Sequence, residues 1–152
     1  ITWSFYINSN SDVTVCNKLF YQSGPKEVYK EIEQYMSPLA IAVWYSDDGD
    51  TAWNYQRRMK NPHVNYSPVF AFCTESFSTK SCENLCDILY SKYNIKSRIK
   101  PRVRNKKGIT KSYNRIIIEN KSNDDFIALI RPHILPMFLR KIDYQEYLKW
   151  RK

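Results

Sequence analysis

The stretch SPLAIAVWYSDDG, residues 37–49, decides the fold of this chain. Its Ser suits a helix N-cap, and its Pro suits the first helical position, where a missing N–H costs nothing. The residues from Leu39 to Tyr45 are apolar all round, which predicts a helix buried on most sides. Gly49 is placed to end that helix as a C′ glycine. Asp47 and Asp48 then stand at the helix C-terminus, where the helix dipole disfavours each carboxylate by about 0.3–1 kcal/mol.

These two carboxylates have two interpretations from the residues alone. They are either solvated in an ordinary Asp-Asp-Gly turn, which Asp tolerates well, or compensated by a divalent cation. Carboxylates and helix-end carbonyls are hard oxygen ligands, which suits the second interpretation.

Pairs of strands alternate with helices after this first helix. Hydrophobic periodicity predicts, in order, Thr51–Arg58 and Pro68–Thr74 as strands, a helix from Ser78 through Leu89, strands Ile95–Arg104 and Tyr113–Glu119, and a helix capped by Ser122. Residues 135–152 are expected to add one or two helical pieces. The order α-β-β-α-β-β-α implies an α+β fold, with an antiparallel sheet that helices cover on one face. The other face is left for water or a ligand.

The first 36 residues do not follow the pattern of a helix followed by two strands. Ile1–Ile7 predicts a strand and residues 12–21 a helix, which Gln-Ser-Gly-Pro at 22–25 breaks. A strand without a sheet of its own has to be paired or covered. We therefore divide the chain into a segment 1–36 and a domain 37–152.

Charge indicates the class of partner. The net charge is +9 and the pI about 9.4, which implies an anionic partner such as nucleic acid. No apolar run approaches the ~20 residues that span a bilayer, and no membrane partner is expected. The cysteines lack zinc spacing. Heavy use of Lys, Asn, Ile and Tyr is typical of AT-rich genomes such as that of an organelle.

The strand Ile95–Arg104 alternates strictly between basic and other residues. One face carries Lys96, Arg98, Lys100, Arg102 and Arg104. Like charges so spaced repel in the free protein and gain by releasing counterions from a phosphate backbone, and Arg can also pair with guanine. The alternative is a solvated strand face, although such a face normally mixes charge signs. The surface is expected to extend over Trp53, Tyr55, Arg57, Arg58, Tyr113 and Arg115, with core packing an equal alternative for the aromatic residues.

The whole pattern resembles the LAGLIDADG homing endonucleases, most strongly the organellar-intron type. Together with the composition, this resemblance implies an organellar and above all a mitochondrial location. The resemblance covers nearly the whole chain: Ile1-Thr2-Trp3, Leu19-Phe20-Tyr21, Lys26, the helix ending in Asp-Asp-Gly, Thr74-Glu75-Ser76-Phe77 and Ile130–Pro136 stand in family-like order. It implies two αββαββα halves that pair through their motif helices, here with Ala42 and Ser46 as the seam. It also implies saddle-shaped sheets that lie along the DNA major groove. Each half contributes its last acidic motif residue, here Asp48, to hold Mg²⁺, and the nearby basic residues correspond to Lys26 and Lys141, which ordinary surface charge explains equally well.

Only one such motif is present, and residues 1–36 correspond to the tail of a preceding half. A lone half lacks a two-carboxylate metal site, so either a second copy or another polypeptide completes it, or cleavage is lost. We expect a chain that binds DNA or structured RNA and does not cleave alone, with a second half or another protein covering the motif helix and the first strand. The alternatives are a Mg²⁺-dependent homing endonuclease, an intron maturase and a protein recruited to the mitochondrial ribosome.

Overall fold

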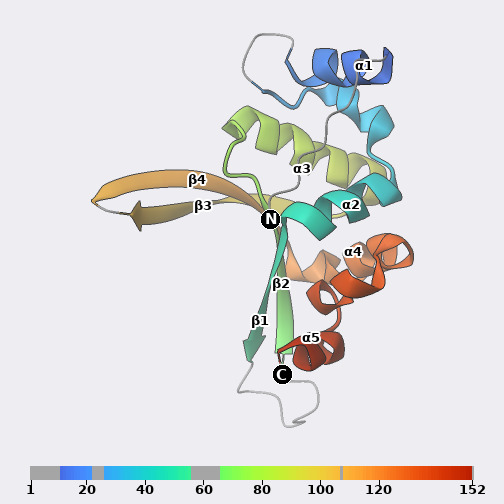
Figure 1. Ribbon diagram of the computed structural model, residues 1–152, viewed down its shortest axis with the longest axis vertical. Coiled ribbons are helices and arrows are strands. Elements are labelled where there is room, and N and C mark those ends of the chain that lie inside the picture. The colour runs from blue at the N-terminus through green and yellow to red at the C-terminus, as the bar shows by residue number, and fades with distance from the viewer. Residues whose placement is uncertain (1–10, 22–25, 56–65, 107, 152) are drawn as a thin grey trace, which may run out of the picture.

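The computed structural model describes residues 11–21, 26–55, 66–106 and 108–151. The elements from the motif onward are α2 (Pro38–Asp48), β1 (Gly49–Tyr55), β2 (Tyr66–Cys73), α3 (Thr79–Tyr93), β3 (Ser97–Lys106), β4 (Ile109–Ile118) and α4 (Asn123–Ile130). Before them lie α1 (Ser11–Phe20) and the 3₁₀ helix η1 (Lys30–Tyr35), and after them η3 (Arg131–His133), η4 (Pro136–Lys141) and α5 (Tyr144–Trp150). A 3₁₀ turn, η2 (Asn120–Ser122), precedes α4. The predicted αββαββα order and the α+β class are confirmed (Figure 1). The predicted strand at Ile1–Ile7 lies outside the described residues.

The sheet is antiparallel throughout, with strand order β1-β2-β4-β3. Only three residue pairs join β2 to β4, from Ala71 with Ile117 to Cys73 with Arg115. The hairpins β1–β2 and β3–β4 therefore leave this junction in different directions, while the helices lie together on one side (Figure 1). One face of the sheet is covered and the other open, as expected. No helix in the described part of the chain is long and apolar enough to cross a membrane.

Helix α2 begins and ends at the predicted residues. The Ser37 Oγ accepts a hydrogen bond from the Ala40 N–H at 3.1 Å, which is the expected N-cap. Gly49 ends the helix as predicted, but its φ of −73° and ψ of 141° are extended and not the left-handed conformation common after a helix. Glycine is required there for space, since a Cβ would overlap the Tyr45 carbonyl oxygen and lie 2.5 Å from Cδ2 of the Tyr45 ring.

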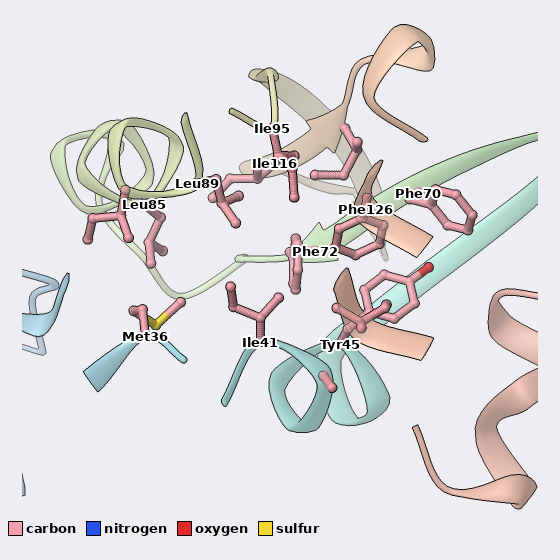
Figure 2. Close-up of a cluster of buried hydrophobic side chains, with 14 of the residues drawn as sticks. Met36, Ile41, Tyr45, Phe70, Phe72, Leu85, Leu89, Ile95, Ile116 and Phe126 are labelled. Carbon is pink, nitrogen blue, oxygen red and sulfur yellow. The ribbon is translucent and has the colours of Figure 1, made fainter. Parts of the chain in front are cut away.

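The core forms around that same tyrosine. Tyr45 is fully buried and meets the rings of Phe70, Phe72 and Phe126 edge to face (Figure 2). Burial of such large rings is the dominant favourable term in folding. These contacts fix α2 against β2 and α4, and so fix the corner where α2 passes into β1.

Within this chain α2 is buried on one face only. Ala42 is fully buried in the core, whereas Leu39 and Val43 are 53% and 56% exposed. The prediction that Ala42 lies in the seam with a second motif helix is therefore wrong. Its small side chain instead lets α2 pack closely within its own domain, and the apolar face left open is that of Leu39 and Val43.

Residues 26–36 are held against α3 by hydrogen bonds. The Glu27 carboxylate accepts from the hydroxyls of Ser78 and Ser81 at 2.6 and 2.5 Å, and Asn84 donates to the Val28 carbonyl at 2.7 Å. Both serine hydrogen bonds hold the pKa of Glu27 below its ordinary value. The division of the chain at residue 36 stays a prediction, but the 26–28 stretch is joined to the N-terminal half of α3.

Candidate nucleic-acid interface

The register of β3 and β4 decides which basic side chains share the open face. Arg98 pairs with Ile117, Lys100 with Arg115, and Arg102 with Tyr113. The side chains of Arg98, Lys100 and Arg102 are all exposed. Cross-strand partners point to the same side of a sheet, so the predicted basic row is assembled on the face away from the helices.

Lys111 extends this row and was missed from sequence. It pairs with Arg104 and is exposed, but the predicted strand began only at Tyr113. The available signal was the alternation of residues 111, 113 and 115. No Asp or Glu occurs anywhere from residue 97 to 118, so the β3–β4 hairpin carries charge of one sign.

Two predicted binding residues lie on the helix side instead. Lys96 precedes β3, and its ammonium lies 5.7 Å from the Tyr90 ring centroid on α3. The Trp53 ring contacts Tyr144 and Tyr147 of α5, with centroids 5.2 and 6.1 Å away, so core packing is the interpretation that holds for it. Among the other predicted residues, Arg57, Arg58 and the side chains of Tyr55 and Arg104 lie outside the description.

Arg115 is on the open face but already has partners. Its guanidinium pairs with Asp50 at 2.9 Å and Glu75 at 3.1 Å, and its side chain is only 15% exposed. Burial works to lower the pKa of Arg115, and the two carboxylates more than offset this and raise it. Charge therefore changes along the open face, from basic on the hairpin to acidic near the end of α2.

The acidic end of α2 is joined to a lysine from the far end of the chain. Asp47 and Asp48 are both exposed. The Lys141 ammonium donates to the carbonyl oxygens of Ser46 and Gly49, both at 2.7 Å, and lies 3.4 Å from that of Tyr45. Burial, with help from the neighbouring Arg140 charge, lowers the pKa of Lys141.

Lys26, which precedes the motif helix in sequence, and Asp48, at the end of that helix, lie at the same hollow. Both line a hollow of about 230 Å³, together with Trp44 and Phe77. The Lys26 ammonium lies 5.0 Å from the Phe77 ring centroid, within the distance of a cation–π contact. Within the described residues, no three His, Cys, Asp or Glu side chains cluster closely enough to hold a metal ion.

Comparison with known proteins agrees with the fold. The sequence matches the LAGLIDADG DNA endonuclease family over residues 1–126. It is 28% identical over 126 residues to a cytochrome b mRNA maturase bI2 of Debaryomyces hansenii, covering 83% of this chain and 40% of that protein. It is 26% identical over 125 residues to a probable intron-encoded endonuclease 1 of Wickerhamomyces canadensis, covering 81% of this chain and 48% of that protein.

Among solved structures, the chain resembles the homing endonuclease I-WcaI bound to its DNA recognition sequence. The TM-score is 0.63 at 25% sequence identity, over 85% of this chain and 51% of the other. The chain thus spans about half, or less, of the length of these relatives.

Proposed function

This chain belongs to the LAGLIDADG DNA endonuclease family, and from that premise we propose that it binds double-helical nucleic acid across the open face of its sheet without cleaving it alone. The observation that carries the proposal is the row formed by Arg98, Lys100, Arg102 and Lys111 on a hairpin that has no acidic residue. Each basic side chain that contacts a phosphate releases condensed counterions, and this release favours binding. In the free protein the same charges only repel one another.

DNA is the partner that we propose first. The row lies on a two-stranded ribbon that projects from the rest of the domain (Figure 1), and the DNA major groove admits a ribbon of that kind. The similar I-WcaI structure is bound to its DNA recognition sequence. Exposed Arg98 and Arg102 can contact either a phosphate or the O6 and N7 atoms of guanine.

Structured RNA is the second candidate, because one relative is named as an mRNA maturase. A-form RNA has a deep, narrow major groove that side chains cannot read, so the hairpin would have to contact phosphates along its edge or single-stranded loops. Under either candidate, we propose an organellar and most specifically a mitochondrial location.

Cleavage would need a second motif helix. We propose Asp48 as one Mg²⁺ ligand, with Lys26 beside it in the same hollow. Bound Mg²⁺ supplies an activated water and stabilises the leaving oxygen. One exposed carboxylate does not hold such an ion, so the second ligand would come from another half. That half would dock on the exposed face of α2 that carries Leu39 and Val43.

The test compares two triple variants that remove the same charge. Replacing Arg98, Lys100 and Arg102 with Gln takes three cations from the open face. The matched control replaces Lys30, Lys80 and Lys149 with Gln; these are 67%, 72% and 72% exposed and lie on helices. Binding to a mixed-sequence DNA duplex is measured by fluorescence anisotropy at several salt concentrations.

The open-face variant is expected to bind more weakly and to lower the salt slope by up to about 2.7, because each lost phosphate contact removes about 0.9 for B-DNA. The control is expected to change the slope by less than about 1. Equal effects in the two variants would mean that net charge, and not this row, drives binding. With Mg²⁺ added, the wild-type chain should leave the duplex uncut; specific breaks that disappear in Asp48→Asn would contradict the non-cleaving half. Repeating the titration with a structured RNA separates the two candidates.

A further inference from the structure

We propose that Lys141 is a positioning residue, which holds the corner between α2 and β1 where Asp48 lies. Its ammonium group bonds to the protein itself and does not contact nucleic acid. The inference rests on the proposed function only in giving Asp48 a metal to hold. It assigns Lys141 a role other than that of a basic group acting on a scissile phosphate.

The donors of Lys141 are all used within the protein. A lysine ammonium has three N–H donors and no acceptor. Three carbonyl oxygens surround it, those of Ser46 and Gly49 at 2.7 Å and that of Tyr45 at 3.4 Å. To contact a phosphate, the ammonium would have to give up at least one of these hydrogen bonds.

Two of the three acceptors, the carbonyls of Tyr45 and Ser46, belong to the last turn of α2. The last carbonyls of a helix have no partner within the helix, and they carry the negative end of its dipole. Here Asp47 and Asp48 add two more negative charges to that end. From the sequence alone, either solvent or a metal ion could compensate this negative charge. Lys141, 92 residues beyond Gly49 in the chain, supplies a positive charge there.

A second connection closes the corner from the other side. The Thr51 hydroxyl donates to the backbone carbonyl of Lys141 and shares a hydrogen bond with the Tyr45 hydroxyl, each at 2.5 Å. Tyr45 is itself fixed among three phenylalanine rings (Figure 2). The ends of α2, β1 and η4 are thus tied to one another. Asp48 lies between two residues that Lys141 holds, so its carboxylate is carried on an immobilised backbone.

The first measurement is nuclear magnetic resonance of the lysine ammonium groups in the free chain. The Lys141 signal should show scalar couplings across hydrogen bonds to the carbonyl carbons of Ser46 and Gly49. These couplings should persist when a mixed-sequence DNA duplex is added. Their absence in the free chain, or their loss together with a shift of the Lys141 signal on adding the duplex, would overturn the proposal. Failure of the chain to bind the duplex would count against the proposed function alone, because the couplings are read in the free chain.

The second measurement separates positioning from general stability. Gly49 donates its N–H to the Tyr45 carbonyl within the corner, whereas Leu89 lies buried in α3. In Lys141→Met, amide exchange should accelerate about tenfold or more at Gly49 relative to Leu89, because charge-assisted hydrogen bonds to the corner are lost. The matched control is Lys92→Met, which removes an exposed lysine that donates to a single carbonyl, that of Glu33, at 2.7 Å. Lys92→Met should leave the ratio of the Gly49 and Leu89 exchange rates unchanged. Equal acceleration at both amides in Lys141→Met would mean that Lys141 only stabilises the fold in general.

Discussion

Replacing Gly49 with Ala tests whether the corner beneath Asp48 is as tightly closed as the contacts indicate. The backbone at Gly49 has φ −73° and ψ 141°, a conformation that Ala adopts freely. At such a position a change from Gly to Ala ordinarily stabilises a protein by about 0.4–1 kcal/mol, through the unfolded chain. A conformational argument alone therefore predicts a more stable variant.

Space gives the opposite sign. The new Cβ would overlap the Tyr45 carbonyl oxygen and lie 2.5 Å from the ring of the same residue. That ring cannot move aside, because Phe70, Phe72 and Phe126 surround it and Thr51 holds its hydroxyl. Overpacking of this kind costs about 1–3 kcal/mol, which leaves a net destabilisation of about 1.3 kcal/mol after the backbone gain.

The assay is thermal unfolding followed by circular dichroism. For a domain of this size the melting temperature should fall by about 3–5 °C. The control is Gly108, at the tip of the β3–β4 hairpin, which has φ +77° and where a Cβ would meet nothing within 4 Å. Ala there costs about 1–2 kcal/mol of left-handed backbone strain, and Asn, which tolerates that region, should recover part of it. An unchanged or higher melting temperature in Gly49→Ala would refute the closed corner.

Two further predictions concern other parts of the fold. Val43→Lys should leave the melting temperature nearly unchanged, because Val43 is 56% exposed. If a second copy of the chain supplies the proposed second half, this change should abolish its self-association in sedimentation velocity; association that survives would place the contact away from α2. Burial works to raise the pKa of Asp143, but hydrogen bonds from Arg131 and from the backbone of α5 hold it below its ordinary value. A depressed carboxyl pKa contributes stability above about pH 4 that is lost as the pH falls further. Asp143→Asn should therefore make the free energy of unfolding fall less steeply below that pH. An equally steep fall in the variant would exclude Asp143 as its cause.

Features that depend on near neighbours along the chain could be predicted from the amino-acid sequence alone. The cap at Ser37, the αββαββα order and the alternation that puts Arg98, Lys100 and Arg102 on one face all follow from local chemistry and from the two periods of helix and strand. The resemblance to the LAGLIDADG family was also readable, since the Asp-Asp-Gly helix and its landmarks stand in order along the chain. The structure changed none of these.

Tertiary structure decided whatever depends on residues distant in sequence. Trp53 faces α5 and Arg115 is held by two carboxylates because of which strands and helices meet, and neither follows from strand alternation. Ala42 looked available for a second helix, and the packing of its own domain buries it completely. Lys141 reaches the end of α2 only because η4 returns to it across the fold. Local pattern sets which way a side chain points, but burial and pairing depend on what the rest of the chain brings to meet it.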